Sequence, residues 1–258
     1  MRKIRVIGIG AGNPEHVTIQ AVNALKTCDV LLVPTKGAEK EFLANLRREI
    51  CDRFITERQP RYVHFAVPPR KSDGEYQRSV AEWHAAIAKI YEDLLLQQVG
   101  EDETVGLLVW GDPMLFDSTL RILEHVQANA RVAFDYDVIA GITSLQALCA
   151  SHRIPLNRIG KPVEITTGRR LSEGWPAQVD DIAVMLDGIR AYETVDTTDV
   201  TIHWGAYLGT PMEIGLSGRL ADIGPEISKV RAEARAKHGW IMDTYILRRP
   251  IDEVDEDQ

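Results

Sequence analysis

The stretch that decides the fold is IRVIGIGAGNP, residues Ile4–Pro14. Its β-branched start predicts a buried strand, and the glycines predict a tight loop at the carboxyl end of that strand. Glycine lets the main chain turn sharply and lie close to a ligand. The loop does not match a dinucleotide-binding fingerprint, because that pattern requires Gly where this sequence has Asn13. The acid that such a site needs at the end of the second strand is also missing, since Asp29 begins that strand and Pro34 ends it.

Outward from this loop, short buried strands alternate with amphipathic helices through the first half of the chain. This alternation predicts an α/β fold with a mostly parallel sheet. In the second half the strands follow one another more directly, which predicts a mixed sheet. The expected strands are 4–9, 29–33, 62–67, 104–110, 132–139, 163–167, 182–186, 200–204, 213–218 and 240–247, and the expected helices are 17–25, 39–50, 75–98, 115–128, 143–151, 190–195 and 222–237.

The length of the chain suggests more than one lobe. At 258 residues it is near the size at which a single hydrophobic core stops growing. We predict an N-terminal α/β lobe over residues 1–117 and a C-terminal α/β lobe over residues 118–258, divided after the Asp112-Pro113 turn. In the long helix 75–98 we expect an apolar stripe to face the core, formed by Trp83, Ile87, Ile90, Leu94 and Gln98.

The composition excludes several classes of protein. With 45% hydrophobic and 26% charged residues, the chain is neither disordered nor fibrous. The net charge is -8, and part of it lies in the acidic tail 252–257. The chain therefore lacks the excess of basic residues that is typical of nucleic-acid-binding proteins. No run of about 18 apolar residues exists, so we expect no membrane span. Cys28, Cys51 and Cys149 form an odd, sparse set without a CxxC pair, which predicts small core residues with reduced thiols in the cytoplasm.

Two further loops carry polar residues at the ends of expected strands. Trp110–Thr119 reads WGDPMLFDST, and Ala140–Leu148 reads AGITSLQAL. Asp112 can cap the helix that follows it or face a ligand, and the hydroxyl groups of Thr143 and Ser144 can do the same. In an open α/β sheet, ligands bind beyond the carboxyl ends of the strands. Taken one at a time, these loops leave both readings open.

The three loops, in this order and spacing over nearly the whole chain, resemble those of the tetrapyrrole methylases. The resemblance implies a two-lobe α/β fold, S-adenosylmethionine (SAM) in the cleft between the lobes, and a homodimer. A closer resemblance is to the branch of this family that acts on precorrin-5 in cobalamin biosynthesis. It rests on the segments Ile165–Leu171, Met185–Gly188 and His203–Pro211, and on Trp110 before Gly-Asp-Pro. That branch removes an acetyl group from ring carbon C-1 as acetate and methylates the same carbon.

The resemblance also implies which residues bind SAM. The matching positions are Gly10, Ala11, Trp110, Gly111, Asp112, Leu115, Thr143, Ser144, Leu186, Asp187, Gly205 and Ala206. Attack of water on the acetyl ketone is helped by a base, for which Asp112, Asp187 and Tyr207 are the candidates, while a lone His203 is more typical of a core histidine.

The multiple carboxylates of a tetrapyrrole require cationic partners. Arg169 and Arg170 suit bidentate pairing with them, although the same two residues can form a solvated turn. The seven histidines show no paired spacing typical of metal ligands, so we predict no metal.

Other functions stay open at this point. One is another branch of the same family, acting on a different corrin carbon or on a protein or RNA target. A second is a module that binds SAM or a tetrapyrrole without catalysis, which the intact glycine loops disfavour. A nicotinamide-dependent dehydrogenase is the weakest, because the dinucleotide fingerprint is incomplete.

Overall fold

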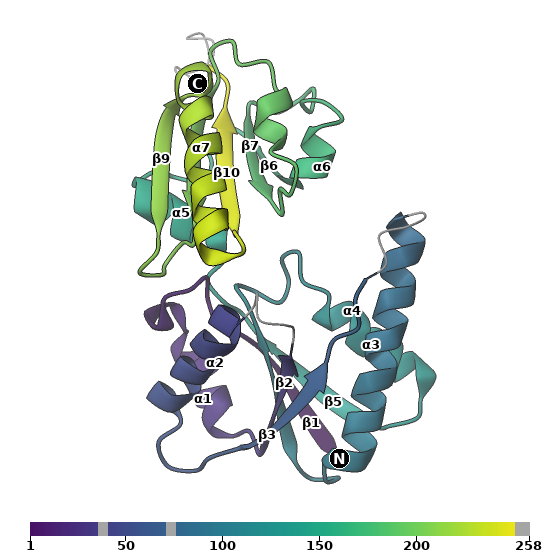
Figure 1. The fold of residues 1–258 in the computed structure, drawn as a ribbon. Helices are drawn as coiled ribbons and strands as arrows, with labels where there is room; N and C mark the ends of the chain where they lie inside the picture. Colours follow the sequence, from purple (N-terminus) through teal and green to yellow (C-terminus); the bar gives the residue numbers. More distant parts are fainter. Residues whose placement is uncertain (36–40, 71–75, 251–258) are drawn as a thin grey trace. The chain divides into compact units, whose positions relative to one another are not determined.

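The computed structural model describes residues 1–35, 41–70 and 76–250. These residues form two compact units, the first ending at Thr143 and the second beginning at Ser144 (Figure 1). Each unit contains one five-stranded sheet, so the predicted two-lobe α/β fold is confirmed. The acidic tail 252–257 and the expected helix starts at Glu39 and Glu75 lie outside the described residues.

The sheet of the first unit is entirely parallel, in the order β3-β2-β4-β1-β5. Parallel strands need crossover connections, and the helices between them supply these. The strands are β1 (Arg2–Gly8), β2 (Val30–Thr35), β3 (Arg61–Ala66), β4 (Thr104–Val109) and β5 (Phe134–Ile139).

Helices cover both faces of this sheet, with α1 and α2 on one side and α3 and α4 on the other (Figure 1). The helices are α1 (Ile19–Lys26), α2 (Glu41–Phe54), α3 (Tyr76–Gln98) and α4 (Thr119–Asn129). Alternate strand residues enter the two cores, as a period of two requires. Ile4 and Val6 of β1 pack under α3 and α4, whereas Ile7 packs under α1 and α2.

The buried face of α3 differs from the predicted stripe. Of the stripe residues only Ile87 is buried, and Trp83, Ile90 and Leu94 are only partly covered. The buried face instead includes His84 and Tyr91. His84 is hydrogen-bonded to Ser118, and Glu92 on the same face accepts from Asn129 and Arg131, so these polar side chains are satisfied although they are buried.

The sheet of the second unit is mixed, in the order β6-β7-β10-β8-β9. Only β6 and β7 pair in parallel, and the other three pairings are antiparallel. The strands are β6 (Val163–Thr167), β7 (Asp181–Met185), β8 (Thr201–Ala206), β9 (Ile214–Arg219) and β10 (Asp243–Arg248), and the helices are α5 (Ser144–His152), α6 (Gly168–Leu171) and α7 (Leu220–His238).

The division between the units falls after Thr143, whereas the sequence suggested a boundary after Asp117. The reason is strand pairing across that stretch. β5 pairs with β1 along its whole length, and α4 packs against α3. Both elements therefore complete the first sheet and its cover rather than starting the second unit.

Two of the three cysteines lie in the core of the first unit. Burial raises the pKa of Cys28 to about 12 and that of Cys51 to about 11, so both thiols stay protonated at neutral pH. All three cysteines are free, and Cys149 is partly buried. These observations support the interpretation of the cysteines as small core residues. None of the helices in the described ranges is long and apolar enough to cross a membrane.

Candidate functional site

Three loops meet at the carboxyl edge of the first sheet. Strands β4, β1 and β5 are neighbours and parallel, so the loops that leave them lie side by side. Gly10 and Gly111 exchange two main-chain hydrogen bonds, of 3.3 and 2.9 Å. The Asp112 carboxylate joins the third loop, because its Oδ2 accepts a hydrogen bond of 2.8 Å from the Gly141 main-chain N–H. The structure thus brings together the three loops that the sequence singled out.

Glycine is required at this junction for two separate reasons. Gly10 and Gly111 have φ of +82° and +69°, which other residues rarely adopt. Gly8 and Gly141 are needed for close approach: a Cβ on Gly141 would lie 2.0 Å from the Gly111 carbonyl oxygen, and one on Gly8 would lie 2.7 Å from the Gly141 nitrogen. With no side chains in the way, main-chain groups form the surface of the junction.

Both carboxylate oxygens of Asp112 accept hydrogen bonds within its own unit. Its Oδ1 accepts a hydrogen bond of 2.8 Å from Met114 N–H, and its Oδ2 holds Gly141. The residue as a whole is buried, at 8% exposed. This geometry favours a role in fixing the loops, where removal of one oxygen would free a buried N–H group. Leu115 continues the same turn, with its N–H 3.3 Å from the Asp112 carbonyl oxygen.

Candidate residues also gather at one edge of the second sheet. Because β7 and β8 each pair antiparallel with β10, and β6 is parallel to β7, all three strands end at the same edge. Gly168 after β6 lies against the Asp187 side chain, since a Cβ there would meet its Oδ1 at 2.2 Å. Leu186 and Tyr207, which follow β7 and β8, have φ of +54° and +51°. Such strained non-glycine residues cluster at binding and active sites.

Asp187 and Tyr207 are engaged in hydrogen bonds of their own. Asp187 Oδ2 accepts from the Ala191 main chain and from the Tyr245 hydroxyl, each at 2.7 Å. The Tyr207 hydroxyl donates to the Trp240 carbonyl oxygen at 2.6 Å. Both side chains are buried, so their polar atoms hold the loops at this edge of the sheet.

The remaining candidates of the second unit lie in different surroundings. Arg169 and Arg170 are exposed on α6, and Arg170 pairs with Glu173. Gly205 and Ala206 are buried in β8. Burial and the charge on neighbouring His152 lower the pKa of His203 to about 4. His203 is therefore neutral at physiological pH, as expected of a core histidine.

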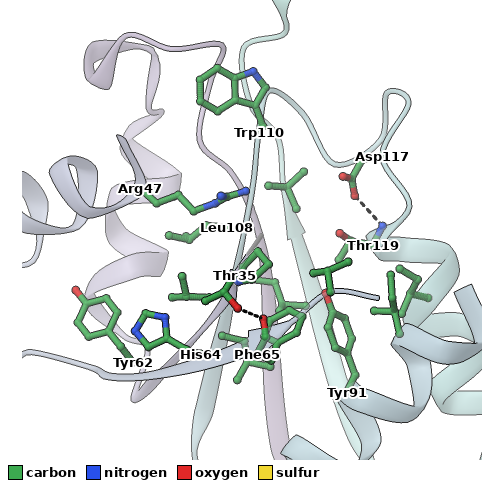
Figure 2. A pocket seen from close by; sticks show the side chains of 18 of the residues that line it. Thr35, Arg47, Tyr62, His64, Phe65, Tyr91, Leu108, Trp110, Asp117 and Thr119 are labelled. Atoms are coloured by element: carbon green, nitrogen blue, oxygen red, sulfur yellow. Dashed lines mark hydrogen bonds between the residues drawn. The ribbon is translucent and has the colours of Figure 1, made fainter. Parts of the chain in front are cut away.

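A pocket of about 760 Å³ opens in the first unit, at the carboxyl ends of β2, β3 and β4 (Figure 2). Its volume is within the usual range for a small-molecule site. Its wall combines aliphatic and aromatic side chains, and α2, α3 and the loop before α4 complete it. The lining includes Arg47, Tyr62, His64, Phe65, Trp83, Tyr91, Trp110, Asp117 and Ser118.

Two polar groups in this pocket lack partners within the described part of the chain. Arg47 extends from α2 into the pocket (Figure 2), and neither an ion pair nor a hydrogen bond of its guanidinium group is found there. Burial lowers the pKa of Arg47 from its ordinary value, but an arginine keeps its charge. The Trp110 indole N–H is likewise buried without a partner. A buried donor without an acceptor is costly, so both groups indicate a ligand that supplies acceptors.

Sequence reasoning found Trp110 but missed Arg47, Ser118 and His84. Arg47 lies in a charged amphipathic helix, where a cation normally faces solvent. Ser118 follows the Gly-Asp-Pro turn, and the hydroxyl at the helix start could have been noted there. His84 gave no signal of its own. Among the residues that the structure describes, no group of three or more His, Cys, Asp or Glu side chains is arranged to hold a metal ion.

Comparison with known proteins connects this geometry to a family. The family model for tetrapyrrole (corrin/porphyrin) methylases matches residues 3–224, which is most of the chain. The chain belongs to this family of methylases. Among curated proteins, this methylase is 60% identical over 253 residues to precorrin-6A synthase [deacetylating] of Sinorhizobium sp., covering 98% of this chain and 97% of that protein. It is 27% identical over 192 residues to precorrin-2 C(20)-methyltransferase of the same genus, covering 71% of this chain and 75% of that protein.

Solved structures share the fold of this methylase. A protein of Corynebacterium diphtheriae described as related to cobalamin synthesis superposes with a TM-score of 0.83 at 38% identity, covering 96% of this chain and 99% of that one. Uroporphyrin-III C-methyltransferase of Thermus thermophilus, solved in complex with S-adenosylhomocysteine, superposes with a TM-score of 0.59 at 19% identity, covering 95% of this chain and 97% of that one. The second likeness shows the fold alone.

Proposed function

We propose that this methylase is a precorrin-6A synthase (deacetylating), a SAM-dependent enzyme of cobalamin biosynthesis. The reaction converts precorrin-5, SAM and water into precorrin-6A, S-adenosylhomocysteine and acetate. The observation that carries the proposal is the 60% identity, over 98% of the chain, to the curated enzyme of that name. The three-loop junction and the pocket of the first unit are the surfaces that we propose for SAM and for the tetrapyrrole.

The loop junction of the first unit fits the methyl donor. Gly8, Gly10, Gly111 and Gly141 leave main-chain groups bare, and the adjacent Trp110 indole N–H lacks a partner among the described residues. These are the features that a nucleoside with hydroxyl and amine groups needs. We therefore propose the SAM contacts that the family implies. They are Gly10, Ala11, Trp110, Gly111, Asp112, Leu115 and Thr143 in the first unit, and Ser144, Leu186, Asp187, Gly205 and Ala206 in the second.

SAM supplies an electrophilic methyl group, and the chain supplies orientation. In-line displacement requires the carbon nucleophile, the methyl group and the sulfur to be collinear, and correct orientation can contribute roughly 7–11 kcal/mol. The rigid junction of Gly10, Gly111 and Asp112 suits that purpose, because its loops are cross-linked by hydrogen bonds. The base that activates water remains a prediction, with Asp112, Asp187 and Tyr207 as its candidates. The hydrogen bonds that these side chains make support a role in positioning the loops.

The pocket of the first unit suits a carboxylate-bearing pyrrole ring. The aromatic side chains in its wall can stack on a conjugated ring, and the Arg47 guanidinium, whose buried Nε has no partner among the described residues, offers donors for a side-chain carboxylate. Arg169 and Arg170 on α6 remain the candidates in the second unit. Since Arg170 already pairs with Glu173, we propose Arg47 as the stronger carboxylate partner.

Replacing Arg47 should weaken tetrapyrrole binding without affecting SAM. We expect Arg47→Met to raise the KM for the tetrapyrrole about 10- to 100-fold, which corresponds to one charged hydrogen bond. The affinity for SAM, measured by calorimetry, should stay within about twofold. The matched variant is the pair Arg169→Ala and Arg170→Ala. If that pair raises KM and Arg47→Met does not, the carboxylates bind at α6 instead.

The reaction itself is decided by mass analysis after incubation with precorrin-5 and SAM. We expect the product to have gained a methyl group and lost an acetyl group, with acetate released. A product that is methylated but keeps the acetyl group would place the chain in another branch of the family. Calorimetry provides a second check: binding of NAD in the absence of SAM binding would contradict the proposal.

We also propose that the enzyme is a homodimer that works in the cytoplasm. The free thiols of Cys28, Cys51 and Cys149 support a reducing compartment. The dimer is what the family resemblance implies. Light scattering of the purified chain measures its mass in solution, and a monomeric mass would contradict that part of the proposal.

A further inference from the structure

A serine in the wall of the first unit's pocket is hydrogen-bonded to a histidine that lies behind it. His84 Nε2 lies 2.9 Å from Ser118 Oγ. Ser118 lines the pocket and is partly buried, whereas His84 is buried on α3, 6% exposed, and does not line it. His84 therefore meets the pocket through the Ser118 hydroxyl. A nucleophile hydrogen-bonded to a base that stands behind it is the arrangement used in acyl transfer.

The Ser118 hydroxyl does not cap the helix that it precedes. Ser118 is the N-cap residue of α4, where a serine side chain normally accepts a hydrogen bond from a helix N–H group. Here it makes no such bond. Asp117 does so instead, with its Oδ1 2.7 Å from the Thr119 N–H (Figure 2). The hydroxyl is left to His84.

The surroundings keep His84 in its neutral form, which can accept a proton. Burial lowers its pKa, the charges of His125 and Arg121 on α4 lower it further, and Asp117 opposes them. His84 is therefore unprotonated at neutral pH. A protonated histidine could not act as a base toward the Ser118 hydroxyl.

We propose that Ser118 is the nucleophile that accepts the acetyl group of the tetrapyrrole and that His84 is its base. The proposal rests on the proposed function, because it concerns the deacetylation half of that reaction. Neither residue belongs to the candidate bases Asp112, Asp187 and Tyr207. On this proposal the pocket both binds the tetrapyrrole and cleaves the bond between the acetyl carbon and ring carbon C-1.

The first chemical step forms an acetyl-serine. The Ser118 hydroxyl proton moves to His84 Nε2, Oγ bonds to the acetyl carbonyl carbon, and the carbonyl π electrons move to the carbonyl oxygen. When the carbonyl re-forms, the bond from the acetyl carbon to C-1 breaks and its electron pair stays on C-1. That pair is then available for the methyl group, and the proton on His84 passes to solvent.

The second step restores the enzyme with water. A water molecule gives one proton to His84 and its oxygen adds to the ester carbon. The bond between Oγ and the acetyl carbon breaks, and Oγ takes the proton back from His84. Acetic acid leaves and ionises to acetate. Water is consumed once, as the overall reaction requires.

An acetyl donor unrelated to tetrapyrroles tests the pair in the intact chain. With p-nitrophenyl acetate we expect a stoichiometric burst of nitrophenolate and an acetyl group on the peptide that contains Ser118. Ser118→Ala should abolish both. His84→Gln keeps a hydrogen-bonding partner for Ser118 but removes the base, so it should slow acetylation about 100- to 10,000-fold. Ser217→Ala, on the exposed surface of β9, should behave as wild type.

The pH profile separates a base from a merely structural histidine. The burst rate should stay constant from neutral pH to below 6.5, the ordinary pKa of histidine, and fall only at lower pH. The groups that face His84 are His125, Arg121 and Asp117, and His125→Asn should move the fall to higher pH. A profile that does not respond to His125 would contradict the assignment of His84.

With precorrin-5 and SAM, the Ser118→Ala variant should lose acetate release and methyl transfer together while it binds SAM normally. Acetate release at the wild-type rate from Ser118→Ala, or no acetyl-Ser118 in the burst, would overturn the proposal and leave the synthase assignment intact. Acetylation of Ser118 without conversion of precorrin-5 by the wild-type chain would instead overturn the proposed function.

Discussion

An alanine at position 141 should disable the methylase while leaving most of its fold in place. The new Cβ would lie 2.0 Å from the Gly111 carbonyl oxygen and within 3.0 Å of the Gly8 main chain. Neither neighbour is a flexible side chain, so the loops after β1, β4 and β5 must move apart. A shift of about 1 Å at a positioning site can cost about 100-fold in rate. We expect a loss of this size in kcat/KM for SAM.

Unfolding experiments provide the second measurement for Gly141→Ala. Overpacking of this kind costs about 1–3 kcal/mol of the free energy of unfolding. The matched control is Gly100→Ala in the same unit, because the nearest atoms to a Cβ there belong to the flexible Glu103 side chain, at 3.4 Å. Wild-type SAM affinity and wild-type stability in Gly141→Ala would show that the three loops are not in contact.

The Arg231→Met variant should lose stability more severely than any surface change. Arg231 on α7 forms a buried ion pair with Asp243 on β10, with 2.9 Å between Nε and Oδ2. Its Nη2 also donates to the Asp187 carbonyl oxygen at 2.9 Å. Removing one partner leaves the other charge buried and unpaired, which costs about 3–5 kcal/mol. Denaturant unfolding measures this loss.

Two further variants separate the ion pair from simple loss of a long side chain. Arg235→Met, one turn further along α7 and exposed, should change the free energy of unfolding by less than about 0.5 kcal/mol. The double variant Arg231→Met with Asp243→Asn should be more stable than Arg231→Met alone, because it removes the unpaired charge of Asp243 and keeps an acceptor for the Trp204 indole N–H. If the double variant is the less stable of the two, the unpaired charge does not cause the loss.

The pattern of apolar residues was sufficient to predict the order of the strands. Strand β6 begins and ends at the predicted residues, and β3 is displaced by one residue toward the N-terminus. Helix α3 ends at Gln98, as predicted, while its predicted first residue lies outside the described residues. Local sequence encodes such boundaries because a buried strand and an amphipathic helix each need their own periodicity. Helix α6 was missed, since four residues are too few to show a period.

The candidate site was predicted only in part. The glycines of the loop junction and Asp112 could be found, because glycine at a strand end and an acid after it are local signals. The hydrogen bond from Gly141 to the Asp112 carboxylate could not be predicted, since the two residues are 29 positions apart in the sequence. Arg47 was passed over because a cation on an amphipathic helix gives the same pattern whether it faces water or a pocket.

By itself, the sequence determined the α/β class, the two-sheet organisation and the family, since each depends on residue order and periodicity. Only the tertiary structure decided which face of α3 is buried, that the first unit extends to Thr143, and that His84 stands behind Ser118. The physical reason is the same in each case. Burial depends on the partners that a residue meets, and Ser118 is 34 positions from His84 along the chain, so no local pattern records their contact.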